Sequence, residues 1–122
     1  MTMTSNAERK AALAELSRIE RDKKAVSERL KQERKEALAR GDRATADRIT
    51  RQRIQLGHQH VRLMNAKRRV NSSGNIAQAT ARLKGLADKA DRAVRNLNSL
   101  AKALDAVADI IRILKALTGA FV

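Results

Sequence analysis

His58 and His60 are the side chains of this sequence whose ordinary pKa lies closest to neutrality, and imidazole can act as a base or bind a metal ion. The two histidines are two positions apart, which places them roughly 200° apart around a helix. Two histidines on one helical face that share a metal ion need a spacing of four residues instead. We therefore expect an exposed His58 and a half-buried His60 rather than a metal site.

The other residue types that perform catalysis are scarce or scattered. The chain has no Cys and no Tyr, and its 13 carboxylates alternate with basic residues at helix-pairing distances, as in Glu20–Lys24 and Glu36–Arg40. No glycine-rich phosphate loop is present, and long helices rich in Ala and Leu seldom form the concave pocket that an enzyme needs. The sequence predicts a protein that is not an enzyme, with no catalytic residue, no metal site and no cofactor.

Positive charge is the most functional-looking property of the chain. It has 27 Lys and Arg against 13 Asp and Glu, and a net charge of +14, which attracts polyanions. Residues 43–70 hold eight of these cations and a single acid, Asp47. Cations near the end of a helix also suit its dipole, which explains part of the cluster. We predict an anion-binding surface here, made of Arg48, Arg51, Arg62, Lys67, Arg68 and Arg69.

The composition also restricts how such a surface could bind nucleic acid. Proteins that bind single strands stack bases on aromatic side chains, and Phe121 is the only aromatic residue in the chain. No zinc-finger pattern is present, and helices this long disfavour a helix-turn-helix motif. What remains is contact with the phosphate backbone, which has little sequence preference and depends strongly on salt.

The elements that carry these residues are predicted to be helices only. The chain has no Pro and is rich in Ala, Leu, Lys, Arg and Glu, so the fold class is all-α, a helical bundle or coiled coil. Ser5 and Glu8 fit a capping box, Gly41 fits a helix C-terminus, and Asp42 and Asn75 fit N-caps. We expect three long helices over about 6–40, 43–70 and 76–117. They form one elongated domain over 1–122, with a basic helical hairpin (6–70), a loop (71–75) and a long heptad helix (76–122).

The third expected helix has an uncharged heptad seam over six heptads, a period that indicates left-handed supercoiling. The flanking positions toward its C-terminus are apolar as well, so the face is too wide for a simple dimer. Two interpretations stay open: the helix is the centre of a bundle within one chain, or several chains pack their third helices together. The core or oligomerisation residues that we predict are Leu83, Leu86, Leu97, Leu100, Leu104, Val107, Ile111 and Leu114.

Three functions are compatible with these patterns. The first is a structural or assembly protein that forms a homo-oligomer through the heptad helix and presents its basic surface to nucleic acid or an acidic protein. The second is a non-sequence-specific nucleic-acid-binding protein that contacts phosphates through residues 43–70. The third is a membrane-active protein that inserts residues 103–122, although four charges in that segment disfavour insertion.

The ends and the hydropathy of the chain bear on its location. The first residues lack the apolar core of a signal peptide, and no run of about 18 uncharged apolar residues occurs. We therefore expect a cytoplasmic protein or a component of an assembled particle, and not a transmembrane protein.

Overall fold

Helices account for nearly all of residues 6–74 and 76–121, which are the residues that the computed structural model describes. The predicted all-α bundle is confirmed, and no strand occurs in the described part of the chain. The elements are α1 (Asn6–Ala39), α2 (Arg43–His58), α3 (His60–Ser72), α4 (Ala77–Ala93), α5 (Leu100–Ala116) and a short 3₁₀ helix, η1 (Leu117–Phe121).

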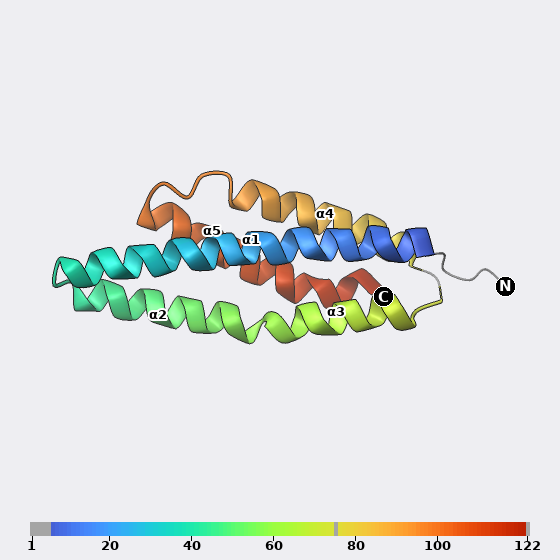
Figure 1. Cartoon of the computed structure of the whole chain (residues 1–122), viewed down its shortest axis with the longest axis horizontal. Coiled ribbons are helices and arrows are strands. Elements are labelled where there is room, and N and C mark those ends of the chain that lie inside the picture. Colours follow the sequence, from blue (N-terminus) through green and yellow to red (C-terminus); the bar gives the residue numbers. More distant parts are fainter. Residues whose placement is uncertain (1–5, 75, 122) are drawn as a thin grey trace.

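Helices α1 and α4 run in one direction along the long axis of the molecule, and α2, α3 and α5 run in the other (Figure 1). The 34 residues of α1 span about 51 Å at 1.5 Å per residue, and α2 and α3 return along it. The shorter helices α4 and α5 complete the bundle: α1 contacts every other α-helix, whereas α4 does not contact α2 or α3. The connection between α1 and α2 extends past the one between α4 and α5, so one tip of the bundle consists of two helices only (Figure 1).

The tight turn between α1 and α2 has the two signals that the sequence predicts. Gly41 has φ of 74°, which Gly adopts without steric penalty, and the amide of Asp42 donates to the carbonyl of Ala37 at 2.8 Å. The carboxylate of Asp42 caps α2 by accepting from the amide of Thr45 at 3.1 Å. It also accepts from the hydroxyl of Thr45, and these hydrogen bonds lower the pKa of Asp42. The other two predicted caps, Ser5 and Asn75, lie outside the described residues.

The second predicted helix is interrupted once. Helical structure runs from Arg43 to Ser72, but Gln59 separates α2 from α3. Its amide donates to the carbonyl of Leu56 at 3.1 Å, three residues back rather than four. The two segments continue in the same direction (Figure 1), so they still present one outer surface.

The third predicted helix is wrong as a single element. Residues 94–99 are not helical, and the chain reverses there so that α5 packs antiparallel to α4 (Figure 1). The break contains Asn96, Asn98 and Ser99, whose short polar side chains compete with helical hydrogen bonds. The hydroxyl of Ser99 caps α5 by accepting from the amide of Lys102 at 3.2 Å.

The reversal explains the broad apolar face of the C-terminal segment. Helix α5 contacts α1, α2, α3 and α4 of the same chain, so it needs an apolar surface on more than one side. Its fully buried stripe is displaced from the predicted seam and consists of Ala103, Ala106, Val107, Ile110, Ile113 and Leu114, continued by Leu117 of η1.

The predicted seam therefore divides into two groups. Leu83, Val107 and Leu114 are buried in the common core. The other five residues, Leu86, Leu97, Leu100, Leu104 and Ile111, pack against that core but stay half-buried. The interpretation in which the segment is the centre of a bundle within one chain agrees with this packing. Association between chains stays a prediction.

Candidate anion-binding surface

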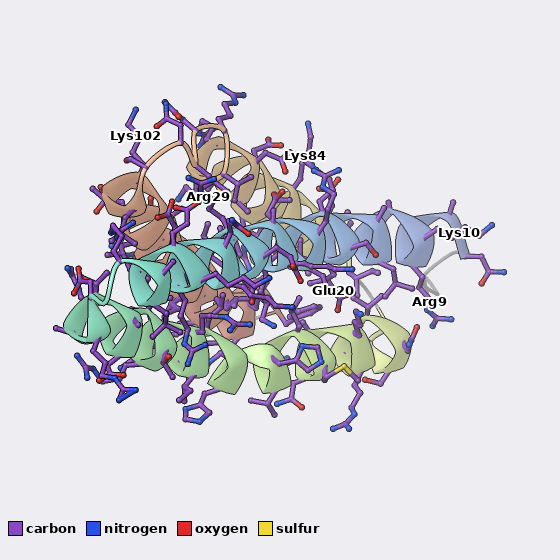
Figure 2. The ribbon with its side chains drawn as sticks, turned by 60° about the vertical axis from the view of Figure 1, so that its left-hand side comes forward. Arg9, Lys10, Glu20, Arg29, Lys84 and Lys102 are labelled. Atoms are coloured by element: carbon purple, nitrogen blue, oxygen red, sulfur yellow. The ribbon has the colours of Figure 1, made fainter. Side chains whose placement is uncertain are left out.

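The outer side of α2 and α3 has six arginines, which we call the α2–α3 basic face: Arg43, Arg48, Arg51, Arg62, Arg68 and Arg69. All but Arg62 are exposed, and Arg62 is half-buried. Nitrogen-bearing side chains project outward along both helices (Figure 2). Because the arginines are spread over 27 residues of nearly continuous helix, the face is about 40 Å long.

The charges of this face are not neutralised by the rest of the bundle. Among the described residues, no carboxylate lies within 4.0 Å of any of its six guanidinium groups. The only acid in α2 or α3 is Asp47. Unpaired arginines side by side repel each other, so the arrangement is stabilised when an anion binds across them.

One predicted member of the anion-binding set is placed differently. The ammonium group of Lys67 forms an ion pair with Glu20 at 3.0 Å, and Glu20 lies between α1 and α3 (Figure 2). Lys67 is half-buried, unlike its neighbours Arg68 and Arg69. Lys67 therefore ties α3 to α1, and the structure separates it from the other five predicted residues.

The remaining predicted residues form two groups along the face. Arg48 and Arg51 lie on α2, near the two-helix tip. Arg62, Arg68 and Arg69 lie on α3 and line a pocket of about 350 Å³ between α3 and η1, which we call the α3–η1 pocket. Its volume falls within the range of small-molecule sites.

Contacts within the pocket hold its side chains in place. Arg62 donates from Nε to the amide oxygen of Gln59 at 2.8 Å. Arg69 donates to the carbonyl of Phe121 at 3.3 Å, and its guanidinium carbon lies 5.2 Å from the centre of the Phe121 ring. Such a cation–π contact is worth about 0.5–1 kcal/mol at an exposed site.

The opposite electrostatic situation occurs between α1 and α4. Arg18 forms ion pairs with Glu15, Asp88 and Asp91, and Arg21 forms one with Asp91 at 3.0 Å. Hydrogen bonds to Asp91 and Asp88 raise the pKa of Arg18, and the same contact with Arg18 lowers the pKa of Asp88. Arg18 and Arg21 are therefore neutralised by acids of their own chain, unlike the arginines of the α2–α3 basic face.

Asp22 of α1 is a buried acid beside this network. Only 3% of its surface is exposed. Burial and the neighbouring Asp91 carboxylate raise its pKa to about 7, whereas hydrogen bonds with Asp22 and Arg18 lower the pKa of Asp91 to about 2. The next residue, Lys23, is only half-buried.

A second hollow lies between α4 and α5, on a different side of the bundle. It has a volume of about 490 Å³ and an apolar floor that includes Leu86, Ala93 and Ile113, with Lys89 and Arg92 at its rim. Its third cation, Arg112, is paired with Asp109 at 3.1 Å, and Asp109 also lines the hollow. Both hollows are lined by three cations, but one of the three is neutralised by an acid here and none is in the α3–η1 pocket.

Sequence reasoning missed two members of the α3–η1 pocket, Asn65 and Phe121. Asn65 falls in register with Arg62 and Arg69 on α3, a spacing that the sequence contains. The contact of Phe121 with Arg69 spans 52 residues of chain and depends on the reversal at 94–99. A single long third helix would place Phe121 far from α3, so only the correct topology reveals it.

Residues 6–74 and 76–121 contain neither a metal-binding cluster nor a membrane-spanning helix. No group of three or more His, Asp or Glu side chains is arranged to hold a metal ion there, and both His58 and His60 are exposed. The prediction of a half-buried His60 is therefore wrong, because the interruption at Gln59 turns it outward. Within the same residues, no helix combines the length and apolarity required to cross a bilayer.

Comparison with known proteins completes the description of the site. The chain matches no protein-family model, no curated protein and no solved structure.

Proposed function

We propose that this protein binds nucleic acid without sequence specificity, by laying the α2–α3 basic face along a phosphate backbone. The observation that carries the proposal is the row of six arginines with no acidic partner in the described chain. At about 40 Å, the row is as long as one turn of duplex, which rises about 34–36 Å. Arginine suits this role because its planar fork binds phosphate oxygens in pairs.

Binding of this kind makes a quantitative prediction about salt. The logarithm of the association constant falls linearly with the logarithm of the salt concentration, with a slope of about −0.9 for each phosphate neutralised. If all six arginines bind phosphate, the slope is about −5. Fluorescence anisotropy with a labelled duplex of about 20 base pairs, between about 50 and 200 mM salt, measures it.

A pair of matched variants separates the basic face from net charge. The first changes Arg48, Arg51, Arg62 and Arg69 to Gln. The second changes Lys10, Lys24, Lys31 and Lys35 of α1 to Gln, and these four lysines are exposed on a different helix. Each variant removes four charges and keeps helix propensity similar.

The two variants should differ in affinity and in salt dependence. We expect the arginine variant to lower affinity and reduce the salt slope by about 3 to 4, because four phosphate contacts are lost. The lysine variant should change both much less. Equal losses in the two variants would show that net charge alone drives binding, and no binding by the unmodified protein at about 50 mM salt would refute the proposal.

Self-assembly is a second candidate, and one observation favours it. Leu100, Leu104 and Ile111 stay half-buried on one side of α5, next to the exposed Ala101 and Ala108. A second copy that covered this side would bury their remaining apolar surface, at about 25 cal/mol per Å².

Sedimentation at tens of micromolar tests self-assembly. If copies associate through this side of α5, changing Ala101 and Ala108 to Glu should give monomers. A control that changes the exposed Ala14 and Ala25 of α1 to Glu should not affect the assembly. A strict monomer at these concentrations would remove this candidate and leave the first one intact.

A further inference from the structure

The α3–η1 pocket differs from the rest of the α2–α3 basic face because it is concave. Arg48 and Arg51 project from a convex helix surface, which suits a phosphodiester backbone that passes over it. Arg62, Arg68 and Arg69 line one hollow of about 350 Å³. Three cations around one hollow favour a ligand whose negative charge is concentrated at one point.

The charges around the pocket favour a ligand that carries more than one negative charge. None of the residues that line it is acidic, and its other polar side chains, Asn65 and Thr118, are neutral. A phosphodiester carries one negative charge, whereas a phosphomonoester carries about −1.5 to −2 at pH 7 and has three acceptor oxygens. The terminal phosphate of a nucleotide therefore fits this site better than an internal phosphate does.

The pocket is also partly preorganised. Arg69 is fixed by the carbonyl and the ring of Phe121, and Arg62 is fixed through its Nε by Gln59. Arginines that are already ordered lose less side-chain entropy when they bind, so more of the interaction energy appears as affinity.

The remaining surface of the pocket is apolar. Ala66 and Leu117 are buried and form its floor, next to the half-buried ring of Phe121. A sugar or a base attached to the phosphate can pack on this floor and remove apolar area from water. An inorganic phosphate would leave the floor uncovered.

We infer that the α3–η1 pocket binds the terminal phosphomonoester of a nucleotide, with the phosphate between Arg62, Arg68 and Arg69 and the nucleoside on the apolar floor. The inference rests on the proposed function, since it assigns a nucleic-acid end to one part of the same face. Two sources share this chemistry: the phosphorylated end of a nucleic acid and a free nucleoside monophosphate.

The test compares ends that differ only in the phosphate. Anisotropy is measured with a duplex of about 20 base pairs and a two-nucleotide 5′ overhang that ends in either a phosphate or a hydroxyl. Binding of free deoxyadenosine monophosphate, against deoxyadenosine, is measured by calorimetry. We expect roughly tenfold tighter binding of the phosphorylated end, because charge-assisted hydrogen bonds to the additional charge are gained.

Two double variants locate this preference. Changing Arg62 and Arg68 to Gln should reduce the ratio between the two ends to about one, while Arg69 is kept because it holds Phe121. Changing Arg48 and Arg51 to Gln removes the same charge from the same face. This variant should weaken binding of the phosphorylated and the hydroxyl end equally, and the ratio of their affinities should stay near tenfold.

The outcomes separate this inference from the proposed function. If the duplex binds but the ratio is about one and the free monophosphate does not bind, the pocket inference is overturned and the proposed function stands. A ratio that survives the change of Arg62 and Arg68 overturns it too. If the duplex does not bind at all, the proposed function fails. Monophosphate binding that is lost in the Arg62 and Arg68 variant would then still support the pocket.

Discussion

Asp22 is the residue whose environment departs most from that of an ordinary surface acid. It is buried beside Asp91, with the guanidinium of Arg21 3.6 Å from its carboxylate, and its pKa is raised to about 7. In the unfolded chain the same carboxyl titrates near 4. Between pH 4 and pH 7 the folded protein therefore holds a proton that the unfolded chain has released.

The consequence for stability has a definite sign. Because the folded state binds more protons in this window, the free energy of unfolding decreases as pH rises, by at most about 1.4 kcal/mol per pH unit from this group. Asp91, whose pKa is lowered to about 2, behaves in the opposite way: it stabilises above pH 4, and this contribution is lost as pH falls toward 2.

We predict that Asp22→Asn flattens the decline between pH 4 and pH 7, because Asn stays neutral throughout. Urea unfolding at several pH values, for the unmodified protein and the variant, measures the difference. Asp109→Asn is the control, since Asp109 is only half-buried, far along α5, and pairs with Arg112. Parallel curves for the unmodified protein and Asp22→Asn would contradict this account of Asp22.

At the scale of elements, the position of the stripe on α5 decides which leucines hold the fold together. Leu114 is fully buried, whereas Leu104, which belongs to the same predicted heptad seam, is half-buried. Removing a buried Leu side chain costs about 2–5 kcal/mol, because its transfer energy is lost and a cavity forms. Truncating a half-buried Leu loses less transfer energy and leaves a smaller cavity.

We predict that Leu114→Ala lowers the free energy of unfolding by about 2–5 kcal/mol and that Leu104→Ala lowers it by clearly less. Chemical denaturation of the two variants measures this difference, and both variants carry the same Leu→Ala change. Equal losses would indicate the continuous seam of a single long helix, in which both positions face the same partners.

Much of the element structure could be predicted from local signals. Gly41 and Asp42 define a turn because one needs positive φ and the other caps the next helix, and both effects act over a few residues. The break at 94–99 carries comparable signals in Asn96, Asn98 and Ser99, but the uninterrupted heptad period outweighed them. A wide apolar face has the same sequence pattern whether neighbouring chains or neighbouring helices cover it.

The candidate site was predictable only in part, for the same reason. Cation spacing along one helix is local, so five of the six predicted residues do lie on the α2–α3 basic face. The partner of Lys67 on α1 and the partner of Arg69 on η1 are distant in the sequence. These two contacts depend on how the helices pack.

At the scale of the whole molecule, the arginines of the α2–α3 basic face oppose folding because their like charges are not neutralised within the chain. Six guanidinium groups on one side of a chain with a net charge of +14 repel each other most at low salt. If the face binds phosphates as proposed, function and stability compete there.

We predict that the variant with Gln at Arg48, Arg51, Arg62 and Arg69 melts at a higher temperature than the unmodified protein at about 10 mM salt. The gain should shrink at about 500 mM salt, where the Debye length is only a few ångströms. Thermal melting by circular dichroism at the two salt concentrations checks this. A variant that melts lower at both would mean that these arginines stabilise the fold.

The two-helix tip has a consequence for motion. The buried side chains next to the turn are the small Ala37 and Ala46. Neither α4 nor α5 reaches this tip (Figure 1). Segments with few buried contacts open locally at a lower free energy than the global transition. Amide hydrogen exchange should therefore be faster around residues 37–50 than in the centre of α1. Arg43 and Arg48 thus lie on an arm that can adjust to a curved or bent ligand while the rest of the bundle stays folded.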